Sequence, residues 1–240
     1  MKLNQPFHLV KNSPWPIICS FCGLGMATGL LKFIFYENIH LFLFCLSLIF
    51  LLSYQWWRDI RWEGSIEGAH TAYVVNGLYL GIVIFILSEI FFFFSFFWSF
   101  FHISLSSCLE LGYSCPPVGL AFFDPYSIPL LNRIVLLSSG VFVTWGHYGA
   151  LTGKFTDLVV GLLFTTLLGF YFTFLQWLEY KERFFCLRDG IYGGVFFMAT
   201  GFHGLHVIIG RIYLAVRICR RVLGLQTINH HVGLELSIWY

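Results

Sequence analysis

The sequence predicts an all-α protein, a polytopic bundle of membrane-spanning helices that forms one domain over residues 1–240. Only 11% of the 240 residues are charged and 58% are hydrophobic, whereas a soluble domain carries about 25% charged residues. The chain therefore has too few polar side chains to cover a globular surface. Its length accommodates about six or seven spanning helices of about 20 residues each. The net charge of +2 is too small to indicate a nucleic-acid partner.

Six apolar segments follow one another, and polar residues, prolines or interfacial aromatics separate them. The second segment ends at Trp56-Trp57-Arg58-Asp59, where aromatic residues give way to charges as they do at a membrane surface. A polar loop is expected over residues 58–71. The stretch 106–129 contains four prolines, which cannot continue a helix. The predicted helices cover residues 15–35, 39–56, 73–104, 130–151, 158–180 and 190–216, and the apolar segment 232–240 is too short to span.

The distribution of Lys and Arg predicts the orientation, because these residues are enriched in loops on the inner side of a membrane. Eight fall on the side of the N-terminus and five on the other side, which places the N-terminus inside. The eight are Lys2, Lys11, Arg58, Arg61, Lys154, Arg217, Arg220 and Arg221, and the five are Lys32, Arg133, Lys181, Arg183 and Arg188. The segment before Pro16 has no apolar or Arg-rich leader, so no cleaved targeting peptide is expected.

Glu89 lies within one of the most apolar stretches of the chain, residues 84–98. An ionised carboxylate is costly in hydrocarbon, so an intramembrane acid is a candidate functional residue. No Lys, Arg or His shares its face of the predicted helix, and burial without a partner favours the neutral acid. Two interpretations stay open. In the first, Glu89 is a protonated acid that is hydrogen-bonded to a neighbouring helix or to a lipid head group. In the second, Glu89 has a proton-related role.

The predicted helix 190–216 has two distinct sides. Five glycines, at positions 190, 193, 194, 201 and 204, fall within about a third of a turn, and small residues allow close helix packing in lipid. His203 and His206 lie on the opposite side. Hydrogen bonding between helices is favoured over metal or haem ligation for this pair, because His102 and His147 lie near helix ends and supply no matching ligands. Cys19 and Cys22 likewise lack further metal ligands nearby.

Several motifs together resemble one family, subunit III of the mitochondrial-type haem–copper cytochrome c oxidase. The resemblance runs in order along essentially the whole chain. The matching segments are Ser13-Pro14-Trp15-Pro16, Tyr54-Gln55-Trp56-Trp57-Arg58-Asp59, Ser88-Glu89, Phe96-Phe97-Trp98, Glu110-Leu111-Gly112, Pro129-Leu130-Leu131-Asn132, Leu136-Leu137-Ser138-Ser139-Gly140-Val141, Asp189-Gly190-Ile191-Tyr192-Gly193, Ala199 to Gly210 and Asn229-His230-His231-Val232-Gly233 with Glu235.

The resemblance implies seven transmembrane helices, arranged as a two-helix and a five-helix bundle on either side of a lipid-filled cleft. The chain ends at Tyr240, where the family's seventh helix has barely begun, so we expect six full helices and the start of a seventh. The resemblance also implies which residues serve which role. Lipid head groups lie near Trp57, Arg58, Glu63, His70 and Arg220, and Glu89 is the buried acid near the cleft. Apart from the resemblance, helix packing or interhelical hydrogen bonding is expected of Gly194, Gly201, Gly204, His203, His206, His230, His231 and Glu235.

The function that the resemblance implies is that of a non-redox core subunit of respiratory complex IV, which carries electrons from cytochrome c to oxygen. Such a subunit supports assembly, stability and proton uptake of catalytic subunit I and carries no catalytic centre, haem or copper of its own. Its expected partners are subunit I, the other complex IV subunits and structural phospholipids. It is expected in the mitochondrial inner membrane as an organelle-encoded, multi-pass protein with its N-terminus in the matrix.

Two other function classes remain as alternatives. A stand-alone channel or transporter should show broken helices with paired ionisable residues near the midplane, and only Glu89 approaches this pattern. A membrane cytochrome would need histidine pairs on facing helices. The order of the motifs favours the oxidase subunit.

Overall fold

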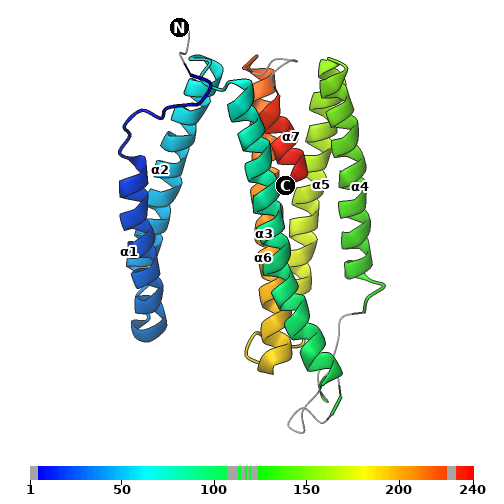
Figure 1. The fold of residues 1–240 in the computed structure, drawn as a ribbon. Helices are drawn as coiled ribbons and strands as arrows, with labels where there is room; N and C mark the ends of the chain where they lie inside the picture. Colours follow the sequence, from blue (N-terminus) through cyan, green and yellow to red (C-terminus); the bar gives the residue numbers. More distant parts are fainter. Residues whose placement is uncertain (1–4, 107–112, 115–116, 118, 120–123, 226–230) are drawn as a thin grey trace. The chain divides into compact units, whose positions relative to one another are not determined.

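The computed structural model describes residues 5–106, 113–114, 117, 119, 124–225 and 231–240. All regular secondary structure in these ranges is helical, which confirms the predicted all-α class (Figure 1). Six helices are long and apolar enough to cross a membrane. They are α1 (Trp15–Tyr36), α2 (His40–Ser65), α3 (Ala72–Leu105), α4 (Ile128–Leu151), α5 (Phe155–Lys181) and α6 (Gly190–Val222), and the shorter α7 (Val232–Trp239) follows them.

The predicted helix boundaries agree closely except at the charged ends. Helix α2 was expected to end at Trp56 and to be followed by a polar loop, but it continues to Ser65. Helix α6 likewise continues past Val216 to Val222. The error has one cause. Charged residues mark where an apolar segment ends, whereas Arg and Glu are good helix formers, so a helix continues beyond its apolar part.

Backbone contacts divide the chain into two units, Met1–Leu78 and Tyr79–Tyr240, and each is described by itself. The first unit contains the hairpin of α1 and α2 together with the start of α3. The hairpin turns at Glu37, whose φ of 54° is left-handed. Next to the turn, the missing side chain of Gly29 lets the two helices touch, because a Cβ there would lie 2.6 Å from the backbone nitrogen of Phe42.

The segment before α1 folds back along the polar end of α2. Three carboxylates at intervals of four residues, two on α2 and one just beyond its end, hold Trp15, the first residue of α1, and two side chains of this segment. The indole nitrogen of Trp15 donates to Asp59 at 2.7 Å, His8 Nε2 lies 3.2 Å from Glu63, and Lys11 Nζ lies 2.7 Å from Glu67. The hydrogen bond to Glu67 and the charge of that carboxylate raise the pKa of Lys11.

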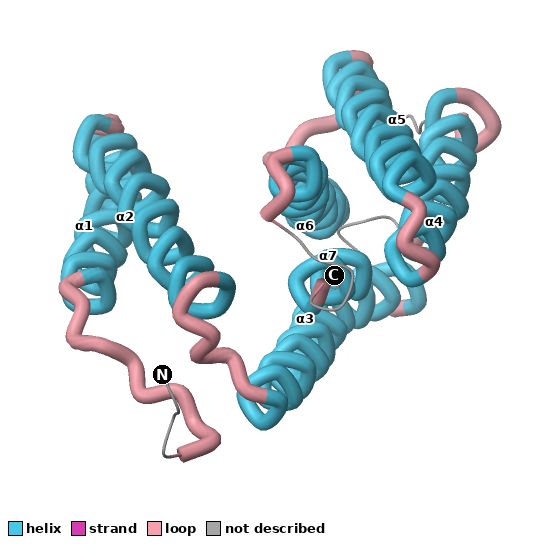
Figure 2. Tube along the Cα trace, turned by 90° about the horizontal axis from the view of Figure 1, so that it is seen from above, coloured by secondary structure: helices cyan, strands magenta, loops and turns pink. Residues whose placement is uncertain are grey.

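In the second unit, α4 and α5 form the closest helix pair (Figure 2). Glycines create this contact: a Cβ on Gly161 would lie 2.7 Å from the Cα of Gly146, and one on Gly149 would lie 2.7 Å from the nitrogen of Leu158. Moving apolar surface from lipid into a helix contact gains little free energy, because lipid tails are themselves apolar. Close backbone packing is therefore a main source of helix association in a membrane. The pair carries a core of Ala150, Leu158, Leu162, Leu214 and Leu234, through which α6 and α7 pack onto α4 and α5.

We expect Gly161→Ala to loosen the α4–α5 pair. The added methyl group would lie 2.7 Å from backbone atoms of Gly146, and overpacking of this kind costs about 1–3 kcal/mol. Gly140→Ala on α4 is the matched control, because a Cβ there meets nothing within 4 Å. Thermal unfolding of the purified subunit in detergent should show a lower midpoint for Gly161→Ala alone. Equal midpoints for the two variants would contradict this packing.

Candidate functional site

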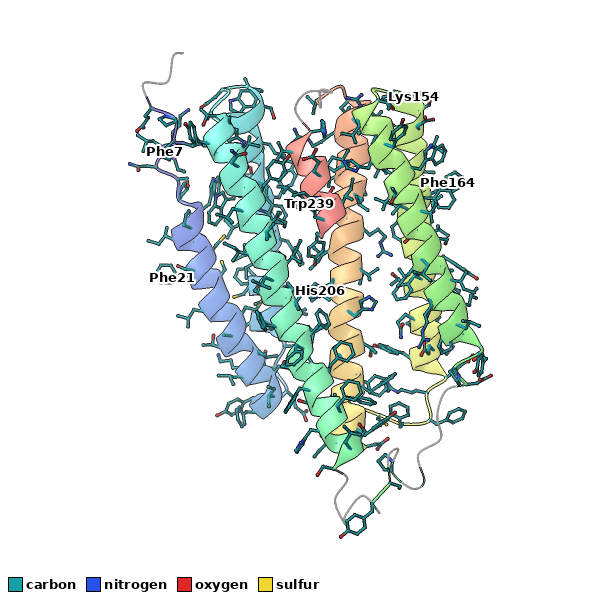
Figure 3. The ribbon with its side chains drawn as sticks, turned by 45° about the vertical axis from the view of Figure 1, so that its right-hand side comes forward. Phe7, Phe21, Lys154, Phe164, His206 and Trp239 are labelled. Atoms are coloured by element: carbon teal, nitrogen blue, oxygen red, sulfur yellow. The ribbon has the colours of Figure 1, made fainter. Side chains whose placement is uncertain are left out.

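The candidate site is centred on Glu89, on the apolar middle part of α3. The carboxylate Oε2 of Glu89 lies 2.9 Å from Nε2 of His206. His206 belongs to α6 and is labelled in Figure 3. The two side chains keep 29% and 24% of their surface exposed, so neither is fully buried within this chain. The sequence pattern indicated no partner for Glu89, because helical periodicity relates only residues of the same helix. The partner is 117 residues away in the sequence.

A second hydrogen bond fixes the orientation of the His206 ring. Its Nδ1 lies 2.7 Å from the backbone carbonyl of Phe202, one turn earlier on α6. A carbonyl only accepts, so Nδ1 must carry the proton and donate it. Only Nε2 is then left to exchange a proton with Glu89. The pair therefore has two forms, a neutral acid with a neutral imidazole or a carboxylate with an imidazolium, and one proton shift interconverts them.

Aromatic rings of α3 and of the residue that follows α7 lie beside the pair. The ring of Phe93 on α3 meets His206 edge to face at 5.2 Å, and Tyr240, at the end of α7, stacks on His206 at 6.0 Å. A groove of about 450 Å³ runs beside them. Its lining is apolar apart from the pair and Tyr240 and consists of Phe85, Ile86, Glu89, Ile90, Phe93, Phe94, Phe97, His206 and Tyr240. An apolar molecule can therefore approach Glu89 from this groove.

A second polar link holds α7 against α3. The hydroxyl of Tyr79 donates to Glu235, and Glu235 also lies 3.0 Å from His231, the residue just before α7. The ring of Trp239 packs 5.4 Å from Tyr79. Together these contacts bring Tyr240 to its position beside His206. His230, which was expected to take part in interhelical hydrogen bonding, lies outside the described residues.

His203 and the glycines of α6 have different surroundings from those expected. His203 does not share the partner of His206, because its ring packs edge to face on Phe172 of α5 at 5.8 Å. A Cβ on Gly201 or Gly204 would meet nothing within 4 Å in the described part of the chain, and one on Gly194 would only just reach the carbonyl of Leu187. The expected tight packing at this face is therefore not made by another described helix. It occurs between α4 and α5.

The residues expected near lipid head groups lie in both units. In the first unit, the side chain of Trp57 is 64% exposed. Arg58 forms an ion pair with the adjacent Asp59 at 3.0 Å. The ring of His70 lies 5.8 Å from the ring of His8, which in turn contacts Glu63. The N-terminal segment thus reaches Glu63 and the surroundings of His70, which sequence reasoning did not anticipate. In the second unit, Arg220 lies in the last turn of α6, beside Arg221.

Comparison with known proteins decides the family. The family model for cytochrome c oxidase subunit III matches residues 5–240. The chain is 48% identical to cytochrome c oxidase subunit 3 of Drosophila melanogaster, over 99% of this chain and 90% of that protein. It is 47% identical to the Branchiostoma lanceolatum protein, over 98% and 90%, and 48% identical to the Rhipicephalus sanguineus protein, over 98% and 92%. The chain belongs to the cytochrome c oxidase subunit III family.

Membership of this family makes the chain a subunit of cytochrome c oxidase, respiratory complex IV, and a multi-pass membrane protein. It gives no support to the channel or transporter alternative. Among the residues that the structure describes, no group of three or more His, Cys, Asp or Glu side chains is arranged to hold a metal ion.

Sequence reasoning missed two polar residues of this subunit III chain. Arg211 lies within the apolar part of α6 and bonds to α5, with Nη1 2.7 Å from the carbonyl of Gly169 and 2.7 Å from the hydroxyl of Thr173. Glu179 on α5 is 8% exposed and lies 3.5 Å from the amide of Asn132 on α4. A signal was present for Arg211, since it is the one Lys or Arg of the 14 that the orientation count did not assign to a loop.

We expect the neutral form of the Glu89–His206 pair and not the ion pair, because an apolar groove disfavours separated charges. Infrared difference spectra of the oxidase should then contain a protonated-carboxyl C=O band that Glu89→Gln removes. Gln keeps the shape and can still donate to His206 Nε2, so assembly should be nearly intact, whereas Glu89→Ala should weaken it. A carboxylate band assigned to Glu89 at pH 7, without the C=O band, would show an ion pair instead.

Proposed function

We propose that this oxidase subunit supports proton uptake by catalytic subunit I, and the durability of that subunit, through the Glu89–His206 pair. The observation that carries the proposal is one hydrogen bond of 2.9 Å between an acid and an imidazole inside the apolar part of the bundle. Placing ionisable groups in hydrocarbon costs free energy, and helix packing alone would not need such a pair. A pair that can hold its proton on either member is suited to accepting and releasing protons.

The geometry favours proton exchange without movement of the helices. The ring of His206 is held by Phe202 and Tyr240, so a proton moving between Glu89 and Nε2 requires no change of rotamer. Part of each side chain remains accessible from the groove. The pair then acts as a local proton store, and electron transfer and oxygen reduction take place in partner subunits.

The redox groups of the complex belong, in this proposal, to other subunits. This chain is a core subunit that packs on subunit I and binds phospholipids, and it carries no haem or copper of its own. The chain resides in the mitochondrial inner membrane, with its N-terminus in the matrix. Two features support that arrangement: the excess of Lys and Arg on the N-terminal side, and the family to which the chain belongs.

Proton uptake by the intact oxidase tests the role of the pair. We expect Glu89→Gln to slow proton uptake several-fold, because an amide cannot exchange the proton that the acid carries. Ser88→Ala is the matched control, since the Ser88 hydroxyl is bonded within its own helix to the carbonyl of Phe85 at 2.6 Å. Unchanged uptake in Glu89→Gln, in complexes with normal subunit content, would leave Glu89 a packing residue only.

We propose further that phospholipid head groups bind at two places, Trp57, Arg58, Glu63 and His70 in the first unit and Arg220 in the second. Each basic residue near an anionic membrane surface contributes about 1 kcal/mol. Arg220→Ala should therefore weaken head-group binding about fivefold and lower the phospholipid retained after mild detergent extraction. Arg220→Lys, which keeps the charge, should retain it. Equal phospholipid content in the alanine variant and the wild type would contradict the assignment.

A further inference from the structure

Arg211 is a charged residue within a membrane-spanning helix, and its guanidinium is held by α5. Nη1 donates to the backbone carbonyl of Gly169 and to the hydroxyl of Thr173, both at 2.7 Å. The Thr173 hydroxyl itself donates to the carbonyl of Gly169 at 2.9 Å. These three groups form a closed hydrogen-bonded ring. A backbone carbonyl is one of the few partners that satisfy an intramembrane cation.

The surface of α5 is shaped for this side chain. A Cβ on Gly169 would lie 3.2 Å from Cδ of Arg211, so glycine leaves the room that the side chain occupies. The guanidinium carbon lies 4.0 Å from the ring centroid of Phe170, a distance typical of a cation–π contact. Carbonyl, hydroxyl and aromatic ring together define one position for the planar cation. Arg211 therefore fixes both the height and the rotation of α6 on α5.

The partner of α6 on its other side is held differently. Among the described residues, no Cα atoms of α3 and α6 lie within 8 Å of each other, whereas α5 and α6 pack closely. Side chains bridge the wider gap, chiefly the Glu89–His206 hydrogen bond and the edge-to-face contact of Phe92 with Phe202 at 5.0 Å. The position of His206 relative to Glu89 thus depends on how α6 is seated on α5.

A small rotation of α6 is enough to change the distance between His206 and Glu89. His206 and Arg211 are five residues apart, which puts them about 140° apart around the axis and about 7.5 Å apart along it. A rotation of α6 by about 10° moves a side-chain end about 6 Å from the axis by about 1 Å. Directed along the Glu89–His206 hydrogen bond of 2.9 Å, such a displacement breaks it, because a donor–acceptor distance of about 3.6 Å is already too long.

We propose that Arg211 is a positioning residue for the Glu89–His206 pair: by locking α6 onto Gly169, Phe170 and Thr173 of α5, it holds the His206 ring at hydrogen-bond distance from Glu89. The inference rests on the proposed function of that pair. It adds a residue that touches neither Glu89 nor His206 and acts through the seating of the helix.

The test measures the hydrogen bond itself in the intact oxidase. The infrared band of the Glu89 carboxyl group, protonated or ionised, is first assigned by its loss in Glu89→Gln. Arg211→Met and Thr173→Val should then shift and broaden this band, because the acid loses its fixed partner. Arg211→Lys, which can still reach the carbonyl of Gly169, should restore it in part.

Thr165→Val is the matched control on the same helix. The Thr165 hydroxyl bonds to Gly161 within α5 and approaches Ser139 of α4, so it has no link to Arg211. The control should leave the Glu89 band unchanged. A purely structural role of Arg211 would lower the amount of assembled complex but leave the band of the assembled fraction as in the wild type, and that result would overturn the proposal.

The test does not depend on assembly of the Arg211→Met variant. If Arg211→Met does not assemble, Thr173→Val still removes one of the two hydrogen bonds of Arg211, together with the bond from Thr173 to the carbonyl of Gly169, while the charge stays. A wild-type band in that variant would overturn the proposal. Proton uptake by Glu89→Gln is measured separately. Loss of the proposed function would appear there as unchanged uptake, whereas failure of the positioning role would appear as an unshifted band in the Arg211 and Thr173 variants.

Discussion

The scarcity of hydrogen-bonding partners in hydrocarbon is the constraint on which the second unit of this structure depends. Lipid offers no hydrogen-bond partners, so several polar groups on the spanning helices bond to groups of other helices. Glu89 meets His206, Arg211 meets a carbonyl and a hydroxyl, and Glu179 meets Asn132. Each of these links joins two different helices. The polar residues of the apolar segments therefore determine which helices face one another.

Two kinds of helix contact result, and they differ in how much the helices can shift against each other. The contact between α4 and α5 is made by glycine backbones, which leave no room for adjustment. The contact between α3 and α6 is made by long side chains across a wider gap and includes the Glu89–His206 pair and the groove beside it. A site that exchanges protons benefits from the second arrangement, because the groove gives access while the aromatic rings restrain the imidazole.

The family relationship and the site describe complementary parts of the function. The relationship identifies the chain as a subunit of cytochrome c oxidase. The site supplies a chemical reason for an acid at position 89, because a neighbouring imidazole whose other nitrogen is already bonded can share its proton. In our proposal the proton pair, the lipid-binding residues and the surface that packs on subunit I serve the same catalytic partner.

The sequence by itself determined the membrane class and the six long apolar helices that the structure describes, and it singled out Glu89 as a candidate, because apolar length and a charge within it are local properties of the chain. It misjudged the ends of α2 and α6, since charge marks the membrane surface and not the end of a helix. Only the tertiary structure decided that His206 faces Glu89, that His203 faces Phe172, and that close glycine packing joins α4 to α5. Those pairings depend on the rotation of one helix against another, which no periodicity within a single helix specifies.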